Sequence, residues 1–243
     1  MGWHTKAAMA LIAASVILYT MHYLIFQDLH HIAIYTLGDI AFMPVEVLVV
    51  SLIIHRLLSE REKRQRLEKL NMVIGTFYSE VGTHTLKKLA DADPENKEKT
   101  NHLKLTNEWK DQDFKKVADT IKKMQYDIDI RKIDLPEFSA YLLEKRDFML
   151  RLLENPTILE HETFTDLLRA VFHLIEELQN RKDLRKLPET DLKHLEGDVK
   201  RVYGLMVMEW IAYMHHLKDN YPYLFSLAIR TNPFDKDATP TVK

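Results

Sequence analysis

The feature that most constrains this chain is an uncharged apolar stretch near its amino terminus. Residues 7–26 read AAMALIAASVILYTMHYLIF and contain no Asp, Glu, Lys or Arg. A helix of this length rises about 30 Å, which matches the hydrocarbon core of a bilayer. The stretch ends close to Tyr23, Phe26 and Asp28, and not in the small residues of a cleavage site. We therefore predict a retained membrane span.

A second apolar region, residues 32–58, follows after the short link QDLHH. So short a link predicts an antiparallel transmembrane hairpin over residues 1–58, with spans at about 7–26 and 32–58. The link has no Lys or Arg, whereas basic residues gather where the second span ends: Arg56, Arg61, Lys63, Arg64 and Arg66. Positive charge favours the cytoplasmic side of a membrane. The expected location is the inner, cytoplasmic membrane, with both termini in the cytoplasm.

The rest of the chain has the apolar spacing of amphipathic helices. Four stripes, at intervals of three and four residues, begin at Phe114, Phe138, Phe164 and Leu192. Each such helix buries one face and exposes the other, so together they predict a helical bundle. The expected fold is all-α: an integral membrane hairpin of two helices, then a helical stalk and a cytoplasmic helical bundle.

Composition sets the expected boundaries after the hairpin. Residues 59–90 are rich in Glu, Lys, Arg and Leu and predict a juxtamembrane helical stalk. The bundle is expected at 91–230, and the polar loop ADADPENKEKT, which starts at Ala90, is expected to connect it to the stalk. The alternation in YDIDIRKIDL indicates a short extended segment. Residues 231–243 predict an extended tail, although its Asn232, Pro233 and Phe234 alternatively dock on the bundle or on a partner.

Three segments carry a resemblance to a known group of proteins. They read EKLNMVIGTFYSEVG from Glu68, RDFMLRLLENP from Arg146, and NYPYLFSLAIRTNPFD from Asn220. These segments follow the predicted transmembrane hairpin, and with it they resemble a group of uncharacterised bacterial two-span membrane proteins with a cytoplasmic helical domain. The resemblance covers most of the chain and implies no activity.

Asp39, Pro44 and Glu46 are unusual residues for a membrane span. An ionised side chain at bilayer depth costs roughly 2.5 to 3.5 kcal/mol on insertion scales. Asp39 and Glu46 share a helix face, and Pro44 between them leaves a carbonyl group free. In an oligomer with this face inward, the two carboxylates would line a cation or proton pore. In the structural alternative, Asp39 lies near the hydroxyl groups of Tyr19 and Thr20. Glu46 is then protonated, or it bonds to a neighbouring chain. Glu46 is therefore the residue that indicates a homo-oligomer.

The basic run that follows the second span has two interpretations. Its five residues from Arg56 to Arg66 are placed to contact anionic lipid headgroups. Glu60, Glu62 and Glu68 in the same region weaken the positive field. The run therefore also fits an orientation signal on a solvated stalk.

Composition excludes several kinds of chemistry. The chain has no cysteine, so disulfides, thiolate nucleophiles and sulfur-ligated zinc are ruled out. A formal net charge of −2 provides no general field for nucleic acid. The sequence has no phosphate-binding glycine loop, dinucleotide fingerprint or serine-hydrolase elbow. We expect no catalytic residue, no cofactor and no nucleic-acid partner.

The histidines, 12 in number, raise the question of a metal site. The segment HETFT, which starts at His161, lacks the second His of H-E-x-x-H, and no Glu is followed three positions later by His. Three groups are spaced to meet: Glu80 with His84, His173 with Glu177, and His215 with His216 and Asp219. Such groups commonly serve as surface or capping residues, so the sequence predicts no metal site.

Aromatic and methionine residues gather on the last long helix, at Tyr203, Met206, Trp210 and Tyr213. They indicate either the centre of the bundle core or a groove that docks a partner helix. Our first functional hypothesis is a non-enzymatic, membrane-anchored adaptor or assembly subunit whose bundle binds a cytoplasmic protein. The alternative is a homo-oligomeric cation or proton channel lined by Asp39 and Glu46. An enzyme at the membrane surface is a third hypothesis, and no motif supports it.

Overall fold

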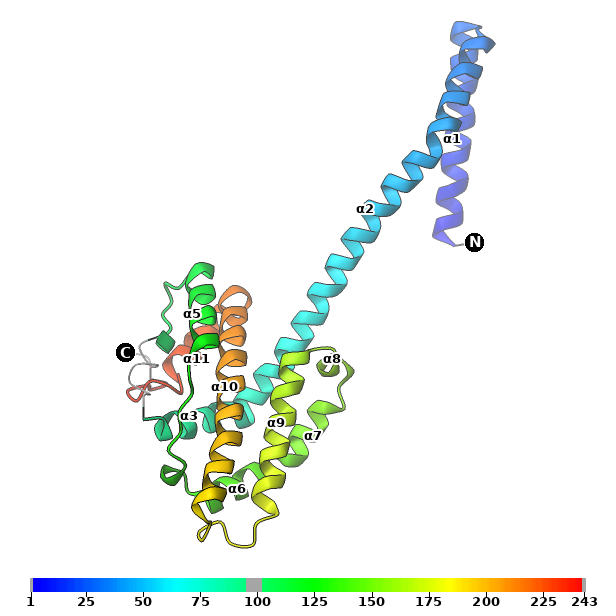
Figure 1. Cartoon of the computed structure of the whole chain (residues 1–243). Coiled ribbons are helices and arrows are strands. Elements are labelled where there is room, and N and C mark those ends of the chain that lie inside the picture. The colour runs from blue at the N-terminus through cyan, green and yellow to red at the C-terminus, as the bar shows by residue number, and fades with distance from the viewer. Residues whose placement is uncertain (1, 95–101, 242–243) are drawn as a thin grey trace. The chain divides into compact units, whose positions relative to one another are not determined.

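The computed structural model describes residues 2–94 and 102–241. The chain divides into two compact units, Met1–Arg64 and Gln65–Lys243. The described residues form helices and no strand, which confirms the all-α prediction. The helices are α1 Trp3–Phe26, α2 Leu29–Phe77, α3 Thr83–Ala92, α5 Asp111–Lys123, α6 Leu135–Glu144, α7 Arg146–Leu153, α8 Pro156–Leu159, α9 Glu162–Gln179, α10 Glu189–Asn220 and α11 Pro222–Arg230 (Figure 1).

In the first unit the chain reverses direction between α1 and α2. Gln27 ends α1 in a left-handed conformation with φ 48°, and its N–H donates to the Tyr23 carbonyl at 2.8 Å. Asp28 then begins α2, because its Oδ1 accepts the His31 N–H at 3.0 Å. The His31 ring also stacks on His22, with 6.0 Å between ring centroids. The short link thus forms a hydrogen-bonded turn.

Both helices of this unit contain a segment that is long and apolar enough to cross a membrane, judged by length and composition. None of the residues in these segments is buried within the chain. Leu18, Phe42 and Ile53 illustrate this, since more than half of each side chain is exposed. The described residues of the first unit, 2–64, therefore form no apolar core.

The boundary predicted between stalk and bundle differs from the structure. α2 continues without a break through Gly75 to Phe77. From Gln65 onward, however, the chain belongs to the second unit. Leu70, Ile74 and Phe77 are buried in the core of that unit. These apolar residues of the expected stalk therefore belong to the core. The helical domain begins about 25 residues earlier than predicted.

A π-helical turn, Tyr78–Gly82, follows α2 directly. Gly82 permits it, because a Cβ at this position would lie 2.5 Å from the Tyr78 ring. Tyr78 is buried and donates its hydroxyl to the Met206 carbonyl at 2.7 Å. Burial raises the pKa of the Tyr78 hydroxyl well above its usual value, which keeps it a donor. The turn thus fixes the end of α2 against α10.

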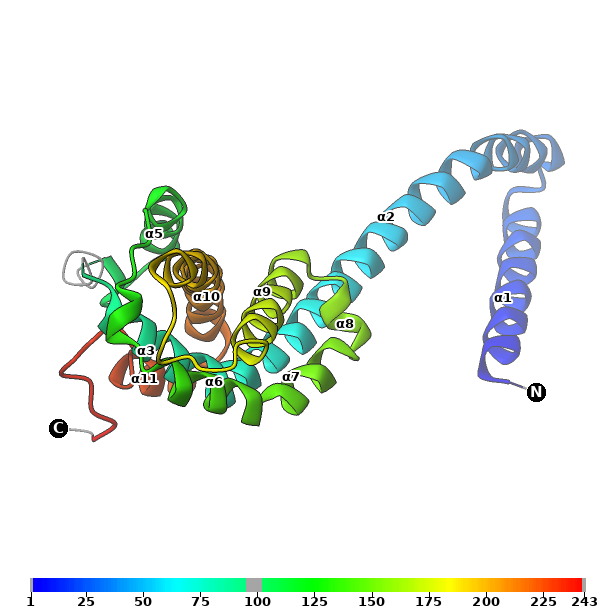
Figure 2. The ribbon, with the colours of Figure 1, turned by 60° about the horizontal axis from the view of Figure 1, so that its bottom comes forward.

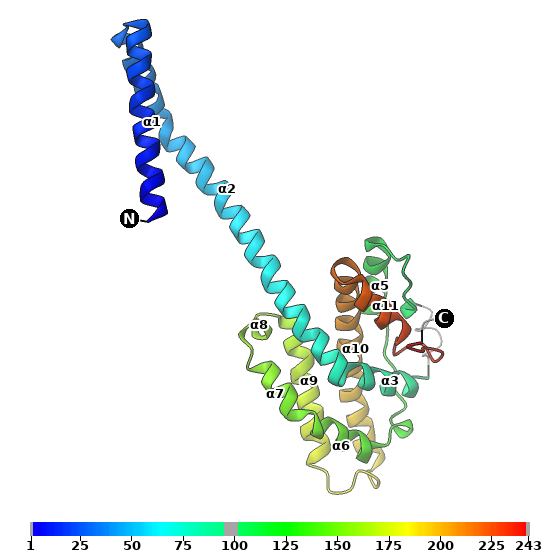
Figure 3. The same ribbon diagram turned by 180° about the vertical axis from the view of Figure 1, so that it is seen from behind.

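Helices α9 and α10 form the centre of the second unit and lie side by side in opposite directions (Figures 1 and 2). α5 and α11 pack on α10, and α6 packs on α9, as the view from behind also shows (Figure 3). The predicted stripes supply the core, since Phe114, Phe138, Phe164 and Leu195 are all buried. The second predicted helix is in fact two, α6 and α7, which meet at Lys145.

The prediction of an extended tail is wrong for its first residues. Asn232 and Phe234 are buried. The Asn232 side chain donates to the Leu103 carbonyl at 2.8 Å and accepts the Phe234 N–H at 3.0 Å. The Phe234 ring packs edge-on against Trp210, with 5.0 Å between centroids. The tail therefore docks on the bundle, which is the alternative that the sequence left open.

Two smaller expectations concern loops. The segment YDIDIRKIDL contains the short 3-10 helix Ile130–Lys132 and no strand, since the Lys132 and Ile133 amides bond back to nearby carbonyls. The polar loop expected from Ala90 begins later, because α3 extends to Ala92. Most of that expected loop, residues 95–100, lies outside the described residues.

Candidate functional site

Most of the partner surface predicted on α10 lies in the core. Tyr203, Met206 and Trp210 are at most 3% exposed, because α3, α5, α9 and α11 all pack against α10. The docking prediction is wrong for these three residues, and the alternative of a bundle core applies. Tyr213 is half-buried and reaches the surface. The search for a binding surface therefore moves to the surroundings of Tyr213.

Tyr213 lines a groove of about 410 Å³ between α2, α10 and α11. Met72, Thr76 and Leu224 form part of its walls. Gly75 brings α2 close to the Tyr213 ring, because a Cβ there would lie 2.6 Å from the tyrosine hydroxyl. The groove thus lies between packed helices, and its shape depends on the close approach that Gly75 permits.

An apolar strip extends from this groove over α11. Met72 and Leu224 are 58% and 38% exposed within the groove. Tyr223 and Leu227, on neighbouring turns of α11, are 71% and 44% exposed. Side chains three and four residues apart share a helix face, so these residues form one continuous surface. The exposed apolar area is longer than the groove itself.

Negatively charged residues lie close to His216, one of the residues that line the groove. His216 lines the groove, and its buried Nε2 has no hydrogen-bond partner among the described residues. Burial lowers the pKa of His216, and the nearby carboxylates of Asp219 and Glu68 oppose that change. Glu68 also accepts a hydrogen bond from the Tyr221 hydroxyl at 3.2 Å. Two carboxylates therefore lie near His216, outside the residues that line the groove.

The residues predicted to lie at membrane depth have no partners within the described chain. Asp39 and Glu46 are exposed, and neither makes a hydrogen bond or ion pair with a described residue. Thr20, expected near Asp39, instead donates to the Val16 carbonyl at 2.7 Å. α2 continues through Pro44. The local pairing predicted for Asp39 is therefore not formed.

The five basic residues predicted to contact lipid headgroups are all exposed. Arg56, Arg61, Lys63 and Arg64 make no ion pair within the described parts of the chain. Arg66, the first of the run inside the second unit, bonds Glu160 at 3.1 Å. Four of the five are thus free to meet an external anion, and Arg66 also holds the end of α8.

Two of the three histidine groups singled out in the sequence form simple surface contacts. The Glu80 carboxylate lies 3.6 Å from Lys145, while the His84 ring packs on Tyr141 instead. His215 Nε2 lies 3.3 Å from Asp111 and 3.6 Å from Asp219. In the latter group both carboxylates are at least half exposed, so solvent screens their interaction with the imidazole.

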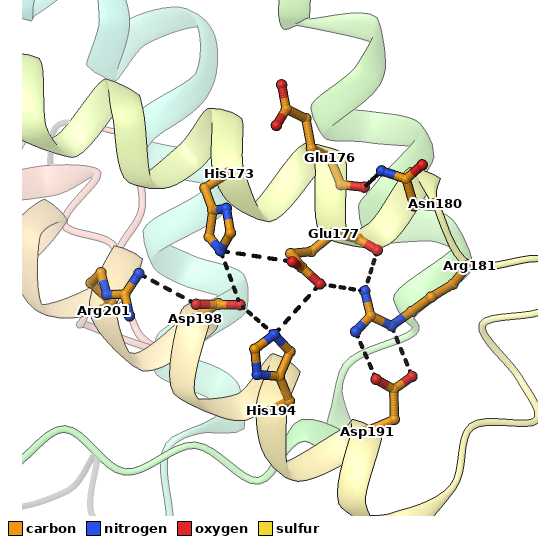
Figure 4. A network of polar contacts seen from close by, with 9 residues as sticks. All are labelled: His173, Glu176, Glu177, Asn180, Arg181, Asp191, His194, Asp198 and Arg201. Carbon is orange, nitrogen blue, oxygen red and sulfur yellow. Dashed lines mark hydrogen bonds and ion pairs between the residues drawn. The ribbon is translucent and has the colours of Figure 1, made fainter.

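The third group, His173 with Glu177, belongs to a larger cluster between α9 and α10 (Figure 4). His173 Nε2 lies 3.9 Å from Glu177 Oε1 and 3.6 Å from Asp198 Oδ2. His194 Nε2 lies 3.5 Å from Glu177 Oε2 and 3.6 Å from the same Asp198 oxygen. Two imidazoles and two carboxylates, one of each from each helix, therefore face one another.

Arginine side chains hold the outer sides of these carboxylates (Figure 4). The Arg181 guanidinium donates a hydrogen bond to Glu177 Oε2 at 2.7 Å and two hydrogen bonds to the Asp191 carboxylate at 2.7 and 2.8 Å. These hydrogen bonds lower the pKa values of Glu177 and Asp191. Arg201 lies 3.4 Å from Asp198 Oδ1. The guanidinium groups thereby fix the direction in which each carboxylate points.

Sequence reasoning missed His194, Asp198 and Arg181. The available signal was a repeated spacing: His173 precedes Glu177 by four residues, and His194 precedes Asp198 by four. Each pair lies on one helix face. Only the packing of α9 against α10 brings the two pairs together, and no pattern within a single helix reports that.

A second cavity, of about 340 Å³, lies between α5 and α10. The carboxyl group of Glu209 faces it and is only 6% exposed. Burial raises the pKa of Glu209, while a hydrogen bond with Thr163 and the proximity of His161 act in the opposite direction. Ionisation of Glu209 is therefore costly in the folded domain.

Comparisons with known proteins agree with the division into two units. Residues 66–230 match the family described as the C-terminal helical domain of the uncharacterized protein MJ1433, and residues 1–58 match that described as its N-terminal helical domain. MJ1433 of Methanocaldococcus jannaschii is 48% identical over 228 residues, which cover 94% of this chain and 92% of the relative. No solved structure matches the chain.

This relative qualifies the resemblance seen in the sequence. The name of this relative gives no activity. Its source is an archaeon, so the comparison does not support the bacterial part of that expectation. The two matched ranges leave out residues 59–65, which contain the boundary between Arg64 and Gln65.

Proposed function

We propose that this chain, which belongs to the MJ1433 family of helical proteins, is a membrane-anchored adaptor that holds a basic amphipathic helix of a partner protein. The first unit is the anchor, an integral membrane hairpin in the cytoplasmic membrane with both termini in the cytoplasm. The second unit is the binding domain. The observation that carries the proposal is the exposed groove between α2, α10 and α11.

The anchor is argued from burial. Both apolar segments of the first unit are long enough to span a bilayer, and none of their residues is buried within the chain. Exposed apolar surface of this extent is unfavourable in water, at roughly 25 cal/mol per Å². Lipid is the environment in which such a surface is stable. The four unpaired basic residues after the second span would then lie beside anionic headgroups.

The occupant of the groove is argued from shape and charge. The apolar strip runs beyond the groove over Tyr223 and Leu227, which exceeds what a small molecule covers and fits the apolar face of a helix. Met72 adapts to different apolar side chains because its thioether chain is flexible. Glu68 and Asp219 near His216 favour a helix with Lys or Arg at its edge.

The test is a site-specific cross-link in cells that make the full chain. A photoreactive phenylalanine at position 72 or 224 should capture one partner peptide, identified by mass spectrometry as an amphipathic helix with basic residues. Leu143 and Leu159 are exposed apolar residues that do not line the groove and serve as matched positions. Those positions should not capture that peptide.

A charge placed in the groove makes the test specific. Met72→Lys should reduce the cross-link from position 224 at least tenfold, since it adds a cation where a basic helix binds. Leu143→Lys should leave the cross-link unchanged. Capture of a second copy of this chain, or of lipid alone, would overturn the proposed occupant.

A homo-oligomeric channel is a second candidate, favoured by Asp39 and Glu46. Both carboxylates lack a partner in the described chain, and a buried charge needs one at membrane depth. Neighbouring copies would supply it, with Asp39 and Glu46 facing a cation or proton pathway. In nanodiscs, a closed ring of copies and an ion flux that Glu46→Gln alters would support the channel. A monomer or dimer without flux would exclude it.

A further inference from the structure

The cluster between α9 and α10 has a feature that ordinary ion pairing does not explain. Hydrogen bonds between charged groups close to about 2.7–2.9 Å. The imidazole nitrogens of His173 and His194 instead stand 3.5–3.9 Å from the oxygens of Glu177 and Asp198. The four groups thus surround a common region without bonding to one another.

Asp198 provides a second, independent indication. Its side chain is only 6% exposed, and its Oδ2 is buried without a hydrogen-bond partner among the described residues. Leaving a buried carboxylate oxygen unsatisfied is costly, at about 1–3 kcal/mol or more. This oxygen points toward both imidazoles (Figure 4). A cation bound at that point would satisfy this oxygen.

We propose that His173, Glu177, His194 and Asp198 bind a divalent transition-metal ion of the Zn²⁺ class. Zn²⁺ takes imidazole nitrogen at about 2.0–2.1 Å and carboxylate oxygen at about 2.0–2.2 Å in a tetrahedron, whose ligand atoms are about 3.4 Å apart. The ligand atoms of His173, Glu177 and Asp198 all lie within 4.8 Å of one another. His194 Nε2 lies 3.5 Å from the other Glu177 oxygen and 3.6 Å from Asp198, so its side chain must move to complete the tetrahedron. Mixed nitrogen and oxygen ligands favour Zn²⁺ over Mg²⁺ or Ca²⁺, which prefer oxygen alone.

The surroundings of the four ligands fit this assignment. Arg181 and Arg201 bind Glu177 and Asp198, in the manner of the outer partners that orient metal ligands. With neutral imidazoles, the carboxylates of Glu177, Asp191 and Asp198 and the two guanidinium groups together carry a net charge of about −1. A bound cation compensates this negative charge. His173 and His194 are 45% and 56% exposed, which gives an ion access from solvent.

The consequence is a metal bridge between the two central helices. Each helix contributes one imidazole and one carboxylate, so a bound ion joins α9 to α10 close to the loop between them. This role is independent of the groove between α2, α10 and α11, because no residue is shared. It differs from the sequence prediction of no metal site, because the ligands come from two helices that only packing brings together.

The test uses the full chain in nanodiscs, first stripped of metal and then titrated with ZnCl₂ in a calorimeter. We expect one ion per chain with a dissociation constant of micromolar or below, and a raised melting temperature. Excess Mg²⁺ should not compete. Co²⁺ in place of Zn²⁺ should give the intense visible absorption of a tetrahedral site.

The variants separate this site from other histidines. His173→Gln with His194→Gln should weaken Zn²⁺ binding at least a hundredfold, and both side chains are exposed enough for the protein to remain folded. His215→Gln with Asp111→Asn alters the other histidine–carboxylate group and should change affinity less than threefold. Absence of Zn²⁺ binding, or binding that survives the His173→Gln/His194→Gln variant, would overturn the proposal.

Discussion

The two units of this chain use the same apolar side chains in opposite ways. In residues 2–64, Leu18 and Phe42 are 65% and 56% exposed. In the second unit, Phe77 and Phe164 are fully buried and their rings meet edge-on at 5.3 Å between centroids. Burial of apolar surface stabilises the second unit in water, whereas the apolar surface of the first unit stays exposed to its surroundings. Hydrophobic content alone does not distinguish these cases; burial within the chain does.

Separating the two regions is the most severe test of this comparison. We expect residues 65–243 alone to be soluble, helical and cooperatively folded, because the described core residues all lie between Leu70 and Phe234. The full chain should remain in the membrane fraction and resist alkaline extraction, as the proposed anchor requires. Fractionation and circular dichroism of both forms are the measurements. A soluble full chain, or an aggregated 65–243 fragment, would contradict the comparison.

Truncating one phenylalanine in each region gives the next largest effect. Phe77→Ala removes a buried ring that contacts Phe164, so we expect the free energy of unfolding to fall by about 3–5 kcal/mol. Phe42→Ala, in the exposed apolar segment, should change it by less than about 0.5 kcal/mol. Denaturant unfolding of the full chain in detergent compares the two. Equal effects would show that both regions fold around a core.

The docked tail tests how far the second unit extends. Asn232→Ala removes the donor to the Leu103 carbonyl and the acceptor of the Phe234 N–H, both buried. We expect the free energy of unfolding to fall by about 1–3 kcal/mol. Lys236→Ala, exposed four residues later, is the control and should have little effect. If the two variants unfold alike, the tail contributes nothing to the unit.

The sequence predicted the individual helices well, but it predicted poorly which helix surfaces pack against one another. Helical periodicity located α5, α9 and α10, because that signal lies within ten to twenty residues. It did not place Leu70 and Ile74 in the core, since an apolar stripe on a helix does not identify the surface that covers it. It likewise left Tyr203 and Trp210 undecided between core and surface. The cluster around Asp198 was missed for the same reason, as its two halves come from separate helices.

The smallest expected effect concerns the charge that the second unit buries. Burial raises the folded-state pKa of Glu209 above its ordinary value of 4.5, so the protonated form is favoured in the folded chain. The resulting stability is fully present below the ordinary pKa and is lost as the pH rises through the raised, folded-state pKa. Gln cannot ionise and keeps the shape of the protonated side chain.

Glu209→Gln should therefore match the original chain in melting temperature at acid pH and exceed it increasingly as the pH rises through that window. Thermal unfolding across a pH series measures the difference. Glu176→Gln, at an exposed position of α9, is the matched control and should produce no such divergence. A constant difference between Glu209→Gln and the original chain at every pH would mean that Glu209 ionises in the folded domain as readily as in the unfolded chain.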